Sequence, residues 1–181
     1  MAFNDLVSLP EGAFSDLANL KVLRLFSNEL TPETLPLGLF AGVPLLQELY
    51  LDSNSLADMT SLEGLFDGLT ELTRLGLSDA GLEIVPAGLF TGLTKLEYLS
   101  LWINGLSSLP DGLLSDLKAL RTLELSGFNL TELGSSLKGL AELRILLLNY
   151  HPLALTEDVF SDLVNLEELE LRDCDLTTLP A

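Results

Sequence analysis

The 181-residue sequence is poor in several residue types on which protein sites commonly depend. Its single cysteine, Cys174, cannot form an internal disulfide, and its single histidine, His151, excludes the usual zinc sites built from two or three histidines. Nine lysine and arginine residues stand against 27 acids, which gives a net charge of −18. A surface this acidic repels phosphate backbones and anionic lipid. We therefore expect no nucleic-acid partner and no membrane insertion.

Long apolar runs are absent too. No stretch reaches the roughly 18 apolar residues of a transmembrane helix. The first five residues are neither basic nor apolar in the way that a secretory signal requires. Together with the missing disulfides, this favours a cytoplasmic location. A secreted protein and a fragment of a larger protein both remain compatible with the sequence.

Motifs that carry catalysis are missing as well. The chain contains no C-x-x-C, H-E-x-x-H, G-x-x-x-x-G-K-[ST] or G-x-S-x-G pattern. Acidic pairs such as Asp173 and Asp175 lack the spaced oxygen ligands and the turn glycine of a calcium loop. His151 has no serine or cysteine nucleophile at a recognisable spacing. The sequence thus predicts no enzyme, no metal site and no cofactor.

What the chain has in abundance is leucine, with 51 residues that recur on a long period. The pattern L-x-x-L-x-L returns seven times, ending at Leu25, Leu51, Leu77, Leu101, Leu125, Leu148 and Leu171. We call the residue three positions after each of these leucines the ladder position. One further ladder position, Asn4, lies one period before the first of them. The ladder positions are Asn4, Asn28, Asn54, Ala80, Asn104, Phe128, His151 and Cys174, at spacings of 23 to 26 residues. About seven repeats therefore fill residues 1–181, which predicts a single domain.

These motifs resemble the leucine-rich repeat family, whose signature is L-x-x-L-x-L-x-x-N/C-x-L. Leu-Pro-Glu-Gly-Ala-Phe at 9–14 and Val-Pro-Ala-Gly-Leu-Phe at 85–90 are similar to its typical class, with repeats of about 24 residues. The cysteine-rich caps of secreted relatives are missing. The resemblance implies an α/β fold: a right-handed solenoid, a curved horseshoe segment. Its parallel sheet would line the concave face, with loops and short helical or 3₁₀ turns on the convex face.

The repeat also assigns structural roles. Alternation in L-x-L places the leucines on one face of a strand. The ladder residues, whose role in similar proteins is to bond to backbone groups, are Asn4, Asn28, Asn54 and Asn104, with His151 and Cys174 as substitutes. Alanine cannot make such bonds, so we expect backbone groups beside Ala80 to be left to water or to a weaker partner. A second apolar column should pack along the return path: Phe14, Phe40, Phe66, Phe90, Leu114, Leu137 and Phe160. Extra residues near 31–36 and 57–62 should bulge on the side opposite the sheet.

The residues that point away from the leucine core should line the concave face. Their 21 positions hold five acids, three arginines, the only tryptophan and two of the three tyrosines. Exposed aromatic residues beside arginine are typical of binding hot spots, although aromatics also favour strands in general. We nominate Arg24, Phe26, Tyr50, Arg74, Tyr98, Trp102, Ile145, Leu147 and, at the edge of the face, Tyr150.

The sequence thus predicts a non-enzymatic module that binds a protein or peptide on this face. Two alternatives stay open: self-association through the uncapped solenoid ends, as a weak homodimer, and recognition of a carbohydrate or small ligand by the aromatic residues. Asn129, Leu130 and Thr131 also match the acceptor pattern for N-glycosylation.

Overall fold

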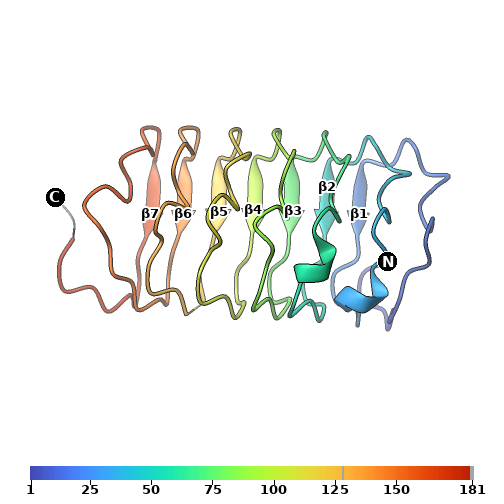
Figure 1. Cartoon of the computed structure of the whole chain (residues 1–181), viewed down its shortest axis with the longest axis horizontal. Coiled ribbons are helices and arrows are strands. Elements are labelled where there is room, and N and C mark those ends of the chain that lie inside the picture. The colour runs from blue at the N-terminus through green and yellow to red at the C-terminus, as the bar shows by residue number, and fades with distance from the viewer. Residues whose placement is uncertain (128, 180–181) are drawn as a thin grey trace.

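The structure is a computed structural model that describes residues 1–127 and 129–179. Seven strands form one parallel sheet in which each strand pairs with the next along the chain (Figure 1). They are β1 (Val22–Arg24), β2 (Glu48–Tyr50), β3 (Arg74–Gly76), β4 (Tyr98–Ser100), β5 (Thr122–Glu124), β6 (Ile145–Leu147) and β7 (Glu168–Glu170). Two 3₁₀ helices, η1 (Pro32–Thr34) and η2 (Thr60–Leu62), are the only helices in the described residues.

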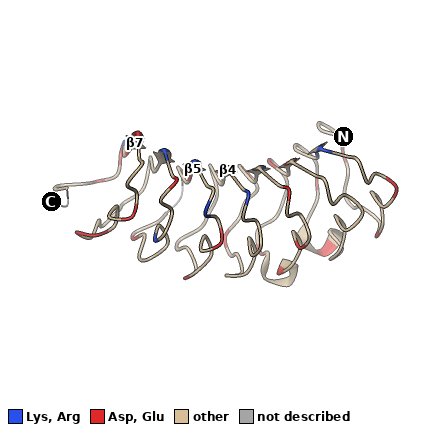
Figure 2. Cartoon of the chain, turned by 90° about the horizontal axis from the view of Figure 1, so that it is seen from above, with Lys and Arg blue, Asp and Glu red and all other residues tan. Residues whose placement is uncertain are grey.

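The register of the sheet aligns the repeats one on another. The central leucines of successive strands are direct partners, from Leu23 opposite Leu49 to Leu146 opposite Leu169. In β1 to β6 this leucine is buried, because alternation turns it toward the core. Figure 2 shows the sheet along one edge of the molecule, and this edge curves inward between the two ends. The predicted curved solenoid with the sheet on its concave face is confirmed.

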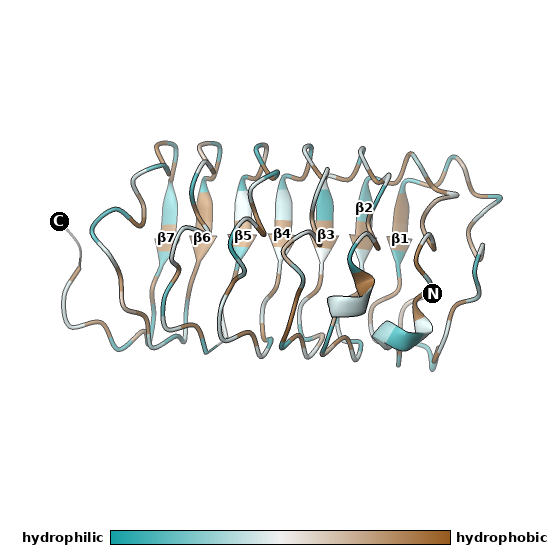
Figure 3. Cartoon of the chain, viewed as in Figure 1, coloured by the Kyte–Doolittle hydropathy of each residue, from teal (hydrophilic) through white to brown (hydrophobic). Residues whose placement is uncertain are grey.

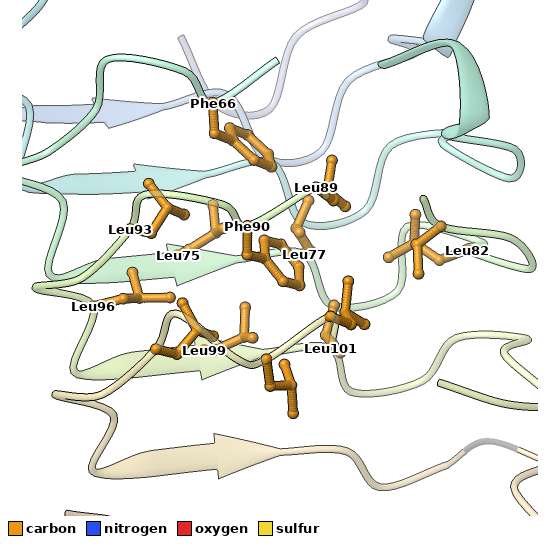
Figure 4. Packing of buried hydrophobic residues seen from close by; sticks show 14 of the residues in the cluster. Phe66, Leu75, Leu77, Leu82, Leu89, Phe90, Leu93, Leu96, Leu99 and Leu101 are labelled. Atoms are coloured by element: carbon orange, nitrogen blue, oxygen red, sulfur yellow. The ribbon is translucent and has the colours of Figure 1, made fainter. Parts of the chain in front are cut away.

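The core lies between the sheet and the returning turns. The rings of Phe14, Phe40, Phe66 and Phe90 stack on one another with centroids 6.3 Å apart. Leu114 and Leu137 are buried and continue the column, whereas Phe160 is half-buried. Figure 4 shows how Phe66 and Phe90 pack beside the strand leucines, among them Leu75 and Leu99. The predicted packing role of this column is confirmed.

The longer second and third repeats use their extra residues for the two helices η1 and η2. Both lie on the side of the molecule opposite the sheet (Figure 2), as the repeat lengths predicted. Pro32 is the first residue of η1. A backbone N–H at this position has no acceptor within the helix, so proline loses no hydrogen bond there. Leu62 of η2 is buried, so the extra segment adds to the core as well as lengthening the turn.

Asparagine ladder residues join adjacent repeats through their side chains. Asn54 Nδ2 donates to Leu51 O at 2.8 Å and to Leu25 O, one repeat earlier, at 3.0 Å. Its Oδ1 accepts from Leu30 N at 3.1 Å. Asn28 and Asn104 make the same kinds of bonds, whereas Asn4 donates only to the nearby carbonyls of its own segment.

The expectation for Ala80 is wrong. Leu56 N, which an asparagine at this position would bond, donates to Ala80 O at 2.7 Å instead. The two carbonyls to which an asparagine here would donate already accept side-chain hydrogen bonds. Leu51 O accepts from Asn54, and Leu77 O accepts from Asn104 at 2.9 Å. Ala80 N itself donates to Asn104 Oδ1 at 3.1 Å. Because each of these asparagines bonds to backbone groups of two repeats, Asn54 and Asn104 compensate for the asparagine that is missing at Ala80.

The substitutes at the end of the ladder keep the expected contacts. His151 is buried and its Nε2 bonds to Leu125 O at 2.8 Å. Cys174 Sγ donates to Leu148 O at 3.0 Å. Each contact reaches the preceding repeat, as the asparagine contacts do. Phe128 lies outside the described residues.

Candidate binding face on the concave sheet

The nominated residues lie on the concave face or its edge, and none of them is fully buried. Arg24, Arg74, Trp102 and Tyr150 are exposed, whereas Phe26, Tyr50, Tyr98, Ile145 and Leu147 are half-buried. Trp102 is 47% exposed, which is high for a side chain of this size beside a sheet. Strand alternation explains this placement, because the neighbouring Leu101 takes the core side and is 1% exposed.

Two tyrosines on the face are each covered by an arginine of the preceding strand. The Arg24 guanidinium lies 5.5 Å from the Tyr50 ring centroid, and that of Arg74 lies 4.2 Å from the ring of Tyr98. Tyr50 also donates its hydroxyl to Glu48 Oε2 at 3.1 Å, and Arg24 approaches the same oxygen at 3.7 Å. These contacts hold the aromatic rings in fixed orientations, which lowers the entropic cost of using them for binding.

The face differs in polarity along its length. Figure 3 shows β6 as apolar and β7 as polar, because Ile145 and Leu147 on β6 give way to Glu168 and Glu170 on β7. At the other end, Phe26 packs edge to face on Phe3 with ring centroids 5.0 Å apart. Tyr150 lies beyond β6, where its left-handed backbone turns the chain out of the sheet.

Three short polar side chains among the 21 positions expected on the exposed face are buried: Ser100 at 2%, Ser126 at 3% and Asn149 at 7% exposure. Their polar atoms are hydrogen-bonded to neighbouring groups of the face. Ser78 Oγ and Ser100 Oγ are 2.6 Å apart, and Ser100 donates to Glu124 Oε2 at 2.6 Å. Ser126 Oγ accepts from Asn149 N at 3.0 Å. The middle of the concave face is therefore a hydrogen-bonded polar floor.

The short side chains leave a hollow beside the tryptophan. It has a volume of about 280 Å³ and is lined by Trp102, Glu124, Ser126, Leu147 and Asn149. The sequence predicts Trp102 and Leu147 of this set as binding residues. Glu124, Ser126 and Asn149 are also among the 21 outward positions, but no motif distinguishes them, because these residue types on a strand carry no signal of their own.

Burial also perturbs two titratable groups of the face. It raises the pKa of the Asp52 carboxyl above its ordinary value, although the N–H of Ser78 donates to that carboxylate at 2.9 Å. Burial likewise raises the pKa of the Tyr98 phenol to about 12, and the negative charge of Glu124 adds to this shift. Both groups therefore favour their neutral forms more than they would in water.

The remaining candidates for chemistry have structural surroundings. Cys174 and His151 are buried in the ladder. Among residues 1–127 and 129–179, no three histidine, cysteine or acidic side chains are grouped in a way that could hold a metal ion. No helix in this described part of the chain has the length and apolar character needed to cross a bilayer. The cytoplasmic location remains a prediction.

A family model named Leucine rich repeat matches residues 1–56 and 94–153. No curated protein is significantly similar to the chain in sequence. Among solved structures, Drosophila Toll in its glycosylated complex with Spatzle superposes with a TM-score of 0.79 at 29% identity, over 97% of this chain and 26% of that one. TLR13 in its complex with ssRNA13 gives 0.78 at 25% identity, over 99% and 30%. The internalin InlF of Listeria monocytogenes gives 0.71 at 22% identity, over 95% and 46%.

The chain thus spans less than half the length of each of these three proteins. Two of these neighbours are bound to a partner, in one case a protein and in the other an RNA. Binding to proteins and other ligands is a common role of this fold. The RNA complex does not support our exclusion of nucleic acid, which was based on net charge alone. The family model covers well over half of the sequence, and the strand leucines repeat in register across the sheet, so the chain belongs to the leucine-rich repeat family.

Proposed function

We propose that residues 1–181 act as a single, non-enzymatic domain that binds a protein or peptide on the concave face. The observation that carries this proposal is the exposed Trp102 on a sheet face that also presents two tyrosines, each covered by an arginine. Interface hot spots are enriched in these three residue types. Toll bound to Spatzle is a precedent for a protein partner on a similar solenoid.

The charge of the face favours a protein over a nucleic acid. Its 21 positions carry five acids and three arginines. Each of the arginines contacts a tyrosine or a glutamate of the same face: Arg24 and Arg74 lie over tyrosines, and Arg172 donates to Glu170 Oε1 at 2.8 Å. A phosphate backbone needs several free cations to replace its counterions, and this face offers an excess of carboxylates instead.

A peptide library displayed on phage tests the proposal directly. Peptides selected on the wild-type protein should lose at least about tenfold in affinity on Trp102→Ala or Tyr50→Ala, the loss expected at a hot spot. The control Val164→Ala removes part of an exposed apolar side chain away from the sheet and should leave binding unchanged. The proposal is overturned if no peptide is enriched, or if every enriched peptide binds the concave-face variants as tightly as it binds the wild type.

A further inference from the structure

The hollow beside Trp102 has the dimensions of a site for one side chain. Its volume of about 280 Å³ lies just below the roughly 300–1,000 Å³ usual for small-molecule sites. It opens on the concave face, so its occupant comes from a partner. Hollows between the turns, such as that lined by Glu63, Gly64, Asp67, Gly88 and Thr91, contain no aromatic residue.

The walls of this hollow combine an aromatic ring, an aliphatic side chain and a carboxylate. Trp102 contributes the ring, and tryptophan has the face to which cations bind best. Leu147 contributes apolar surface from β6, and Glu124 contributes the carboxylate from β5. Ser126 and Asn149 form a buried polar floor.

Among the described residues, the Glu124 carboxylate has no lysine or arginine as an ion-pair partner. It is half-buried, and its Oε2 accepts a hydrogen bond from Ser100 at 2.6 Å. In the described part of the chain, neither lysine nor arginine comes within ion-pair distance of it: the ion pairs of the concave face are Arg24 with Glu48 and Arg172 with Glu170. The other arginine of the face, Arg74, lies over the Tyr98 ring.

A second carboxylate lies next to the floor of the hollow. Asn149, which forms part of that floor, donates from Nδ2 to Glu170 Oε2 at 2.7 Å. The exposed Arg172 donates to the other oxygen of this group and offsets its charge. The net charge around the hollow is therefore negative, and Glu124 is the acid in its wall that lacks a cation.

From these observations we infer that the hollow binds a basic side chain of the partner, with arginine preferred over lysine. The inference rests on the proposed function and specifies one group that the partner presents. A guanidinium stacked on Trp102 donates N–H groups to Glu124, and its aliphatic stem packs against Leu147. An ammonium group lacks the planar surface for stacking. A neutral occupant covers Glu124 without pairing it, and an acidic occupant is repelled.

The single tryptophan makes the test specific, since its one indole N–H resonance reports occupancy of the hollow. The probes are three blocked tripeptides, acetyl-Gly-Xaa-Gly-amide, in which Xaa is arginine, citrulline or glutamate. Citrulline has nearly the shape of arginine without its charge. We expect a saturable shift of the indole resonance with the arginine peptide. We expect about tenfold weaker binding of the citrulline peptide, equivalent to about 1.4 kcal/mol, and no saturation with the glutamate peptide.

A matched pair of variants separates the local carboxylate from the general acidity of the protein. Glu124→Gln should abolish the preference for arginine over citrulline. Glu157→Gln makes the same change of charge at an exposed position outside the sheet and should retain the preference. The inference is overturned if the arginine peptide gives no saturable shift, if citrulline binds equally well, or if Glu124→Gln keeps the preference.

The two proposals fail differently. If library peptides bind the concave face but the tripeptides show no preference for arginine, the proposed function stands and only the basic-side-chain site is wrong. If the arginine preference is present while no library peptide depends on Trp102 or Tyr50, the hollow is a cation site and the proposed function is wrong.

Discussion

The carboxylate of Asp52 lies over Gly76, at the place where any other residue would carry its Cβ atom. A Cβ on Gly76 would be 2.8 Å from Asp52 Oδ1 and 2.9 Å from Asp52 Cγ. Asp52 follows β2 and Gly76 ends β3, so the two residues belong to adjacent repeats. The glycine thereby makes room for an acid that is half-buried on the concave face and bonded to Ser78 N.

Gly76→Ala should push this carboxylate toward solvent. The new methyl group displaces the flexible end of Asp52 and breaks its bond with Ser78 N, at a cost of up to about 1 kcal/mol. Since burial is the main cause of the raised pKa of Asp52, that pKa should fall back toward the ordinary value of 3.8. An NMR titration of the Asp52 carboxyl in both proteins measures the change. An unaltered pKa in the variant would contradict the close approach of the two residues.

Asp52→Asn should stabilise the protein at neutral pH. A carboxyl whose pKa is raised on folding is less favourable as an anion in the folded state than in the unfolded chain. Its ionisation therefore reduces stability above the folded-state pKa and has no effect below the unfolded value of about 3.8.

The stability gain from Asp52→Asn should therefore shrink as pH falls through the acidic range. Urea melts at several pH values test this, with Asp16→Asn as a control for the loss of one exposed negative charge. Equal gains from the two variants at neutral pH would show that the burial of Asp52 is unimportant.

Trp102 should behave as a partly solvated fluorophore in the free protein. With 47% of its surface exposed, its emission should be red-shifted, and acrylamide should quench it readily. The quenching constant should reach roughly half of that measured for the same protein unfolded in denaturant, where the ring is fully accessible. A blue, protected emission would mean that the ring is covered, either by the fold or by a second molecule.

Ile103 should be a point of backbone strain. Its φ of 51° lies in the left-handed region, which is unfavourable for a β-branched residue. Asparagine tolerates this region better, and 45% of Ile103 is exposed, so Ile103→Asn should raise stability by about 1 kcal/mol. Ile84→Asn is the control, because Ile84 is similarly exposed at 52% and has no positive φ. The explanation by strain fails if both variants change the free energy of unfolding equally.

The repeat architecture could be predicted from the sequence because one period determines the strand, the turn and the core layer together. Leu49 and Leu75 meet in the sheet because they hold equivalent positions in successive repeats. The same equivalence placed Trp102 and Tyr98 on the concave face. What a repeat pattern determines is the direction in which each side chain points.

How deep each side chain lies depends on neighbours from other repeats, and the pattern leaves this open. Ser100 points outward as expected, yet it is buried and hydrogen-bonded to Glu124, a residue of the next repeat. The hollow beside Trp102 exists because Ser126 and Asn149 are short and low at that place. The expectation for Ala80 failed for a related reason: the backbone groups that an asparagine there would bond find partners in Ala80 O and in the asparagines of the adjacent repeats.

Among the ladder asparagines, Asn104 makes the most hydrogen bonds to the preceding repeat. Its Nδ2 donates to Leu77 O and Leu101 O, and its Oδ1 accepts from both Ala80 N and Leu82 N. The Oδ1 of Asn54 accepts only from Leu30 N in the preceding repeat. Removing Asn104 therefore leaves one more buried N–H group without its partner, and each such group costs about 1–3 kcal/mol.

Asn104→Ala should accordingly lower the free energy of unfolding by at least about 3 kcal/mol, and by about 1 kcal/mol more than Asn54→Ala. The reverse repair, Ala80→Asn, should bring no gain, because Leu56 N, Leu51 O and Leu77 O have partners in the wild type, and Ala80 has no exposed surface to accommodate an amide. Urea denaturation of the three variants tests this sharing of bonds between repeats. If Ala80→Asn stabilises the protein and Asn104→Ala costs no more than Asn54→Ala, the neighbours of Ala80 do not compensate for the missing asparagine, and the extra bond of Asn104 contributes nothing to stability.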